Sequence, residues 1–366
     1  MDYENPFTPS FGEIPVHLAG RRQIIDNVVR ALESERRRPE LTTLISGARG
    51  TGKTTLLSLL AHKANECGWV AAETTARPGM LEDIEINVRR RGAHLIKERP
   101  ASSLAGIEVA AVGGITLNNR PDAPTNWRSR IEDLLDELEA AGSGLLITVD
   151  EIDPTLPEMI ELAVVHQHYV REGRRVALLM AGLPHNVSAL LSDKTVSFLR
   201  RAQVLTLGRI PDYDVRASML KTINEYGREV AADDLDVAVA AIDGFPFLMQ
   251  LVGYHAWDVS PNEKVISSSD FTHGITIAKA EMEGRILEAT YRELSPVDID
   301  FLGAMLQDEG DSNISDLVER LGKSSSLVAQ YRRRLIDAGV IGERRRGVIG
   351  FDLPYFKEFI ADKLEG

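Results

Sequence analysis

Residues Leu41 to Leu60 read LTTLISGARGTGKTTLLSLL, and this stretch decides how the rest of the chain is interpreted. A short β-branched apolar run leads into a glycine-rich loop and then into an apolar segment with helical spacing. The loop, residues 47–54, fits the pattern G-x-x-x-x-G-K-[ST] at every fixed position. Leu44 and Ile45 end a predicted strand, and a helix is predicted from Thr54 to Cys67. The loop therefore lies between the two elements that the pattern requires.

The residue types in this loop suit the binding of phosphate. Glycines let successive backbone N–H groups turn toward phosphate oxygens, in conformations that a side chain would block. The following helix adds the partial positive charge of its N-terminus. We expect Lys53 to reach the β- and γ-phosphates and the Thr54 hydroxyl to ligate Mg²⁺. The residues expected to hold the nucleotide are Gly47, Ala48, Arg49, Gly50, Thr51, Gly52, Lys53, Thr54 and Thr55. The alternative is a glycine-rich turn beside a helix cap.

Composition indicates a globular protein of more than one domain. The 366 residues are 43% hydrophobic and 27% charged, which is enough apolar material for sizeable cores. A single core seldom exceeds roughly 250 to 300 residues, so we expect two or three domains. No apolar run approaches ~18 residues and no basic-then-apolar leader opens the chain, which predicts a cytoplasmic protein with no membrane partner. The net charge of −13 implies that any contact with nucleic acid is local.

A second motif follows an amphipathic helix predicted over residues 128–141. Residues 145–153 read LLITVDEID, which is typical of a buried parallel strand that ends in acidic residues. In an open α/β sheet, ligands bind at the carboxyl ends of the strands. We expect Asp150 to hold Mg²⁺, directly or through water, and Glu151 to orient and deprotonate the attacking water. An isolated Asp-Glu pair would more often cap a helix, but the upstream phosphate loop favours catalysis.

Further strands are predicted at residues 69–75, 176–182 and 203–207, and a Gly-Gly hairpin at residues 106–117. Such an insertion either touches a partner or DNA or has no function of its own. Arg200 and Arg201 come just before the last strand. An arginine there can reach the nucleotide of a neighbouring subunit and stabilise the transition state, whereas the alternative is an ordinary solvated pair.

Residues 1–20 are rich in turn formers and aromatic residues and precede a helix predicted over residues 21–34. We interpret them as an arm. Four of its apolar residues either pack against a nucleotide base or only cap the sheet, and they are Phe7, Phe11, Pro15 and Val16.

The last segment is predicted to be a winged helix. Helices are expected at residues 296–306, 314–321 and 327–338, followed by a hairpin over residues 340–351. Residues 323–346 hold seven basic and two acidic side chains, a net charge of +5 within an acidic chain. This contrast favours contact with a phosphate backbone, although a charge run is often only a solvated face. The residues expected to contact DNA are Arg332, Arg333, Arg344, Arg345 and Arg346.

The order of these parts resembles the AAA+ ATPases, in the branch that contains the archaeal and eukaryotic origin-recognition and replication-licensing initiators. The likeness rests on GARGTGKT, VDEID, the strand ending in MAGLP, the Arg200-Arg201 pair and the Gly244-Phe245-Pro246 turn. It implies an α/β fold with a P-loop AAA+ parallel-sheet core, a helical lid and a C-terminal winged-helix domain. It also implies that Pro246 starts a lid helix beside the nucleotide.

The chain departs from the resembled family next to that turn. In the family a lid arginine often touches phosphate, but here Phe247 and Leu248 follow Pro246 and no arginine lies nearby in the sequence. This departure is compatible with slow hydrolysis of ATP.

The sequence thus predicts four parts: an arm (1–20), an AAA+ core (21–210), a lid (211–294) and a winged helix (295–366). The resemblance implies a switch that binds and hydrolyses Mg²⁺-ATP, grips DNA and assembles as a nucleotide-dependent homo-oligomer. One alternative is a signal-transduction ATPase of the STAND type, whose winged helix is regulatory. Another is a helper ATPase of a mobile element.

Overall fold

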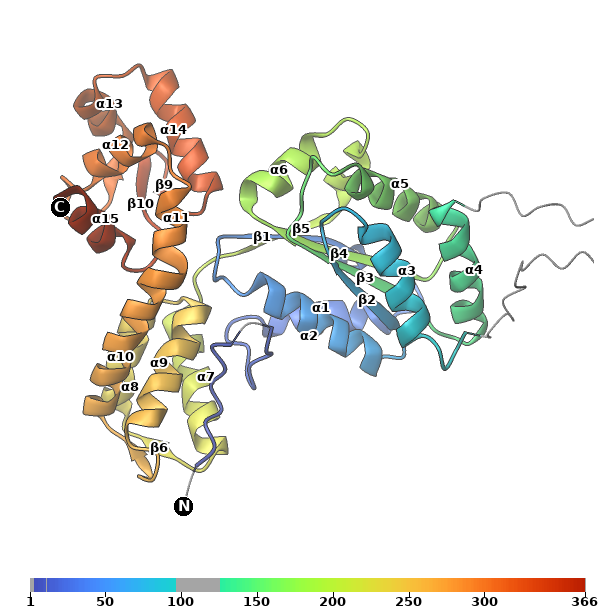
Figure 1. The fold of residues 1–366 in the computed structure, drawn as a ribbon, viewed down its shortest axis with the longest axis horizontal. Coiled ribbons are helices and arrows are strands. Elements are labelled where there is room, and N and C mark those ends of the chain that lie inside the picture. Colours follow the sequence, from blue (N-terminus) through green and yellow to red (C-terminus); the bar gives the residue numbers. More distant parts are fainter. Residues whose placement is uncertain (1–2, 11, 97–125, 366) are drawn as a thin grey trace, which may run out of the picture.

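The computed structural model describes residues 3–10, 12–96 and 126–365 (Figure 1). The hairpin predicted at residues 106–117 and Phe11 of the arm lie outside the described residues. The first half of the chain forms a five-stranded parallel sheet in the order β2-β3-β4-β1-β5. Its strands are β1 (Thr42–Gly47), β2 (Val70–Thr75), β3 (Leu145–Asp150), β4 (Val176–Gly182) and β5 (Gln203–Leu207). The predicted α/β fold is confirmed.

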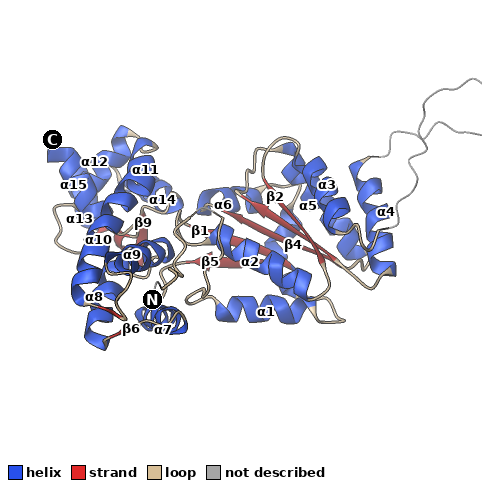
Figure 2. Cartoon of the chain, turned by 60° about the horizontal axis from the view of Figure 1, so that its bottom comes forward, coloured by secondary structure: helices blue, strands red, loops and turns tan. Residues whose placement is uncertain are grey.

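Helices cover both faces of this sheet, as Figure 2 shows. Successive residues of each strand face opposite layers, so that Leu44 packs in one core and Ile45 in the other. One layer holds α1 (Arg22–Leu32) and α2 (Lys53–Glu66). The other layer holds α3 (Met80–Arg91), α4 (Trp127–Ala140), α5 (Pro157–Arg171) and α6 (Pro184–Ser192). Two short 3-10 helices, η1 (Pro39–Leu41) and η2 (Ser197–Arg201), precede β1 and β5.

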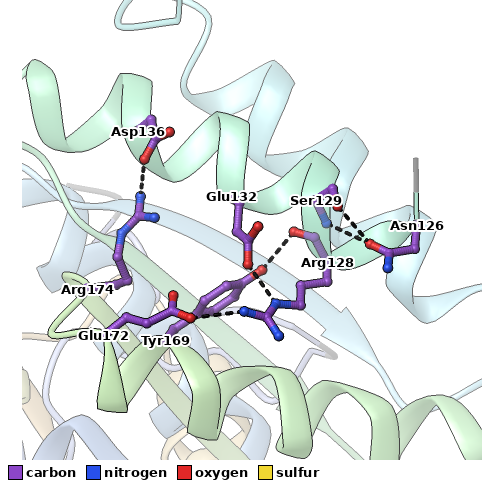
Figure 3. A network of polar contacts seen from close by, with 8 residues as sticks. All are labelled: Asn126, Arg128, Ser129, Glu132, Asp136, Tyr169, Glu172 and Arg174. Atoms are coloured by element: carbon purple, nitrogen blue, oxygen red, sulfur yellow. Dashed lines mark hydrogen bonds and ion pairs between the residues drawn. The ribbon is translucent and has the colours of Figure 1, made fainter. Parts of the chain in front are cut away.

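A polar network fixes α4 to α5 (Figure 3). The Arg128 guanidinium donates from Nε to Glu132 at 2.6 Å and from Nη2 to Glu172 at 2.9 Å. The Tyr169 hydroxyl donates to the carbonyl of Arg128 at 3.0 Å. Burial raises the pKa of Tyr169, so this hydroxyl stays a donor across the working pH range. The network orients α4 over the sheet, and the ring of Tyr169 is part of the apolar core on that face.

The lid is helical, as predicted. It contains α7 (Asp212–Glu225), α8 (Ala232–Ile242), α9 (Pro246–Val259), α10 (Ser268–Met282), the π-helix η3 (Glu283–Leu287) and α11 (Glu288–Arg292). A short parallel ladder of β6 (Glu229–Val230) with β7 (Val265–Ile266) was not predicted. Figure 1 shows α10, η3 and α11 as one continuous rod that leads from the lid to the last module.

The last module has the elements predicted for a winged helix. Its helices are α12 (Pro296–Met305), α13 (Ile314–Leu321), α14 (Ser325–Asp337) and a final α15 (Phe356–Glu365). Its antiparallel sheet has the order β8 (Ser312–Asn313), β10 (Val348–Phe351), β9 (Ile341–Arg345). The Ser324 hydroxyl caps α14 by accepting the N–H of Leu327. One hydrophobic cluster runs through both lid and winged helix, so the division at residue 295 stays a proposal.

The described arm lies against the lid. Phe7 is 2% exposed and its ring meets Trp257 edge-on at 6.3 Å between centroids. Phe7 therefore belongs to the lid core and neither contacts the nucleotide site nor caps the sheet, in contrast to both interpretations offered above. Within the described part of the chain, no helix combines the length and apolarity needed to cross a membrane.

We predict that Phe7→Ala lowers the free energy of unfolding by about 3 kcal/mol, because it leaves a cavity between the arm and Trp257. Urea unfolding followed by circular dichroism measures this loss. Val16→Ala, at a side chain that is 42% exposed, is the control and should change little. Equal stability of the Phe7→Ala and wild-type proteins would contradict the packing described here.

Candidate nucleotide-binding site

The phosphate loop connects β1 to α2 with the backbone that its glycines permit. Gly50 and Gly52 have φ of +76° and +84°, in the left-handed region that other residues avoid. A Cβ on Gly50 would lie 2.5 Å from the ring of Phe245 in the lid. Gly50 is therefore needed both for the turn and for the close approach of the lid to the loop.

Lys53 lies at the start of α2 with its ammonium turned back over the loop. Its Nζ donates to the carbonyls of Gly47 and Ala48, both at 2.9 Å. Burial lowers the pKa of Lys53, and the carboxylates of Asp150 and Glu151 partly offset this effect. A buried ammonium with incomplete charge compensation favours an incoming phosphate, which supplies the missing negative charge.

The two sequence motifs meet at the carboxyl ends of β1 and β3. Thr54 donates from Oγ1 to Oδ2 of Asp150 at 2.5 Å, and the other oxygen of Asp150 accepts the N–H of Glu151 at 2.9 Å. A hydroxyl and a carboxylate side by side are oxygen donors of the kind that Mg²⁺ uses with substrate phosphates. The residues present thus fit a magnesium ion. Glu151 has φ of +58°, a left-handed backbone that costs energy and is common at functional sites.

The phosphate loop opens onto a cavity of about 520 Å³ between core, arm and lid. Asp150 and Glu151 line it at one side, and Pro246 and Phe247 line it from the start of α9. Of the arm residues considered above, Pro15 lies on its wall. The cavity is large enough for a nucleotide and carries its cationic and carboxylate groups around the phosphate loop.

An arginine that the sequence did not reveal also lines this cavity. Arg285, in η3, lies on the cavity wall next to Ile286, whose Cδ1 would be 3.2 Å from a Cβ on Gly50. No arginine lies close to Pro246 in the sequence, but Arg285 lines the same cavity as Pro246. No local motif could have found it, because only the antiparallel packing of α10 on α9 returns the chain to the site.

Arg200 and Arg201 lie on η2, exposed to solvent and away from the cavity walls. Arg200 donates from Nε to the carbonyl of Leu191 at 2.9 Å and lines a shallow surface depression with Thr206. The structure does not bring either arginine to the nucleotide cavity of its own subunit.

The five arginines of the winged helix have different surroundings. Arg344 forms an ion pair with Asp352 at 2.6 Å and donates to the carbonyl of Phe351, so it braces the hairpin. Arg345 and Arg346 are exposed at its tip. Arg332 is half-buried in α14, and its neighbour Arg333 lines a second cavity, of about 470 Å³, between α14 and the core.

The winged helix is docked on the phosphate loop. Helix α14 packs against α6 (Figure 2). At this contact Nδ1 of His185 lies 3.2 Å from the carbonyl oxygen of Asp337. Gly339, just after α14, is so close to Ala48 that an added Cβ would lie 2.5 Å from the Cβ of Ala48. Arg49 of the loop forms an ion pair at 2.9 Å with Glu293 at the end of the rod.

Comparisons with known proteins agree with this geometry. Residues 17–168 match the family model described as AAA ATPase domain, and residues 284–360 match a Domain of unknown function (DUF8462). A stretch of 102 residues is 32% identical to the signal recognition particle receptor FtsY of Bacillus subtilis. That match covers 26% of this chain, and the chain spans only 31% of the length of this curated relative.

Solved structures share nearly the whole architecture at low identity. The ORC2 protein of Aeropyrum pernix, solved as ADPNP-ADP complexes, is 15% identical with a TM-score of 0.64, and 98% of each chain is covered. The Walker-type ATPase of Pyrococcus abyssi is 16% identical with a TM-score of 0.65, covering 94% of this chain and 96% of that one. Cdc6p of Pyrobaculum aerophilum is 15% identical with a TM-score of 0.51, covering 98% and 96%.

The chain has the P-loop AAA+ fold, with the phosphate loop and the acidic strand end at one edge of a parallel sheet, and residues 17–168 match the AAA ATPase domain. Its fold is similar to that of the archaeal ORC2 and Cdc6p structures over nearly the whole chain, which confirms the fold that the resemblance implies.

We predict that Lys53→Ala weakens nucleotide binding by at least about tenfold, because it removes the buried charge that faces the phosphates. Titration with a fluorescent ATP analogue measures the affinity. Lys63→Ala, at an ammonium on the same helix that pairs with Glu66, is the matched control. Unchanged affinity in Lys53→Ala would exclude the loop as the phosphate site.

Proposed function

We propose that this protein binds and hydrolyses Mg²⁺-ATP and uses the nucleotide to switch the binding of DNA by its winged helix. The observation that carries the proposal is the junction of the two motifs, where Lys53, Thr54, Asp150 and Glu151 meet at one wall of a nucleotide-sized cavity. The AAA ATPase domain matched over residues 17–168 supports hydrolysis in general.

In this proposal each residue has one task. The backbone of residues 47–54 and the Lys53 ammonium bind the phosphates, and Thr54 and Asp150 hold the metal ion. The ion would neutralise charge on the phosphate oxygens. Glu151 accepts a proton from the attacking water, whose oxygen forms a bond to the terminal phosphorus as the bond to the ADP oxygen breaks. Water enters on the opposite side of that phosphorus from the ADP leaving group.

Arg200 and Arg201 act in this proposal across a subunit boundary. Both are exposed and neither lines the nucleotide cavity of its own subunit, so only a neighbouring subunit could place them at a phosphate. A nucleotide-dependent homo-oligomer follows, in which an arginine stabilises the charge that develops on the transferring phosphoryl group.

DNA is the proposed partner of the winged helix. Arg345 and Arg346 present two exposed charges at the hairpin tip, and Arg332 and Arg333 follow on α14. Because α14 is docked against α6, the arginines on α14 lie close to the core, and the helix must separate from it to enter a DNA groove. The Arg49–Glu293 ion pair supports a nucleotide-driven separation, since phosphate in the loop competes with Glu293 for Arg49.

The same docking favours a second candidate function. In a signal-transduction ATPase of the STAND type the winged helix regulates the nucleotide site, and here Gly339 and Ala48 are in direct contact. In that case the hairpin arginines would bind no DNA, and the winged helix would serve a protein partner.

We predict that Glu151→Gln lowers the rate of ATP hydrolysis by at least about 100-fold and leaves ATP affinity within about twofold, because it removes only the proton acceptor. Phosphate release and nucleotide titration measure the two quantities. Glu158→Gln serves as a control for a nearby carboxylate that caps α3 by accepting the N–H of Gly79. Full activity of Glu151→Gln would overturn the assignment of the base.

We predict that the paired substitution of Arg345 and Arg346 by alanine weakens DNA binding and lowers the slope of log K against log salt by roughly 2, one unit for each lost phosphate contact. A salt series with ATP and with ADP measures this effect. Arg22→Ala with Arg77→Ala removes two exposed arginines elsewhere and is the charge-matched control. Absence of DNA binding in every nucleotide state at low salt would favour the signalling candidate.

A further inference from the structure

The linker from β5 of the core to α7 of the lid changes partners within three residues (Figure 1). The carbonyl of Gly208 accepts a hydrogen bond at 2.8 Å from Nη2 of Arg21, at the start of α1. The N–H of Ile210 donates at 2.7 Å to the carbonyl of Gly244, between α8 and α9 of the lid. Arg209 lies between these two attachments, so a rotation of the lid relative to the core turns the chain at this residue.

The side chain of Arg209 joins this linker to the lid and to the winged helix. Its Nη1 donates to a carboxylate oxygen of Asp243, the residue that follows α8. Its Nη2 donates to the carbonyls of Phe351 and Asp352, at 3.1 and 3.2 Å, where β10 of the winged helix ends. One guanidinium on the linker therefore contacts both of the other modules.

The contact with Asp243 stabilises an unfavourable helix end. Asp243 has a left-handed φ of +49°, a backbone uncommon for residues other than glycine. A carboxylate at the C-terminus of a helix also opposes the helix dipole. Burial raises the pKa of Asp243, and the Arg209 guanidinium partly offsets this effect. Strained positions of this kind are common in segments that switch.

The turn between α8 and α9 leads directly to the phosphate loop. Gly244 is so close to the linker that an added Cβ would overlap the carbonyl oxygen of Ile210, which lines the nucleotide cavity. The next residue, Phe245, covers Gly50 of the phosphate loop. A shift of the loop on phosphate binding reaches the linker through these two contacts, because close-packed atoms transmit displacements.

On its other side, the contact of Arg209 leads to the hairpin of the winged helix. Nη2 of Arg344 donates at 2.7 Å to the carbonyl of Phe351, the same acceptor that Arg209 uses. Arg344 is followed by Arg345 and Arg346, whose side chains are exposed at the hairpin tip. Two arginines that share one acceptor thus join the linker to the strand that leads to the proposed DNA contacts.

We infer that Arg209 couples the nucleotide site to the hairpin, because it fixes the hairpin to the point at which the lid turns on the core. A nucleotide-driven movement at the linker then repositions the arginines at the hairpin tip. The inference rests on the proposed nucleotide-switched binding of DNA and names the residue that transmits the switch. Arg209 does not line the nucleotide cavity, so it is a positioning residue and not a ligand of the nucleotide.

The first test compares the affinity of the full chain for DNA with ATP and with ADP. In Arg209→Ala the ratio of the two affinities should come to within about twofold of one, because the linker no longer moves the hairpin. Affinity for ATP itself should stay within about twofold of the wild type, since the nucleotide cavity is intact. Fluorescence titrations with labelled DNA and with a fluorescent ATP analogue measure these affinities.

The matched control is Arg216→Ala in α7. Arg216 also pairs with an aspartate of the α8 region, Asp236, and donates at 3.4 Å to a backbone carbonyl, that of Ala232. Its side chain is 35% exposed, against 37% for Arg209, but its contacts stay within the lid. Arg216→Ala should keep the wild-type ratio of DNA affinities.

A second variant separates coupling from stability. Asp243→Asn keeps a residue type that tolerates the left-handed backbone and removes the charge that holds Arg209. It should bring the ratio of DNA affinities severalfold closer to one and have no further effect in Arg209→Ala. A purely structural role would instead weaken DNA binding equally with ATP and with ADP, and that result would overturn the coupling role. Thermal unfolding of each variant confirms that it is folded.

Two failures are distinguishable. Wild-type protein whose affinity for DNA is the same with ATP and with ADP would sink the proposed switch and this inference together. A difference between ATP and ADP that is equally large in the wild type, Arg209→Ala and Arg216→Ala would overturn the inference and leave the proposed function standing.

Discussion

The hydrogen bond from Thr54 to Asp150 is the contact on which the rest of the site depends. It joins the first residues of α2 to the end of β3, two segments that lie 96 residues apart in the sequence. Through it the phosphate loop and the acidic strand end share one edge of the sheet. The same contact brings the hydroxyl and the carboxylate together as a pair of oxygen donors, before any ligand is present.

The lid packs directly against the phosphate loop. Phe245 covers Gly50 so closely that no side chain fits there, and Ile286 approaches the same glycine from the other end of the lid. Gly50 is thus the point where core and lid meet. A change in the loop backbone on phosphate binding would be felt directly by both lid segments, because close-packed contacts transmit small shifts instead of absorbing them.

What the sequence predicts well is what depends on neighbouring residues. The phosphate loop needs glycines at fixed spacing, and β3 needs an apolar run that ends in acids, so both were identifiable from short stretches. The winged helix followed from three short helical patterns within residues 296–338 and from the hairpin pattern over residues 340–351. These features are local, and each is specified by the residues that form it.

What the sequence did not reveal depends on distant packing. Arg285 reaches the cavity only because α10 returns along α9, and no spacing rule encodes that return. The charge run at residues 344–346 looked uniform, yet Arg344 is held by Asp352 while Arg345 and Arg346 are exposed, a difference set by which strand residues face the acidic side chains. Phe7 was associated with the sheet or a base because its partner Trp257 lies far along the chain.

The rod formed by α10, η3 and α11 links the two arginines that flank the phosphate loop. Arg285 is paired with Glu281 where α10 passes into η3, in the second half of the rod, and Arg49 is paired with Glu293 just beyond its C-terminal end. The two contacts differ in one respect. Arg285 moves with the rod that carries its carboxylate, whereas Arg49 belongs to the loop and its carboxylate to the rod. An anion held in the loop would attract Arg49 and so oppose the Arg49–Glu293 contact, whereas the Arg285–Glu281 pair lies wholly within the rod. Arg49 takes part both in anion binding by the loop and in docking of the winged helix. If the anion binds the undocked form more tightly than the docked form, its binding must weaken docking by the same free energy.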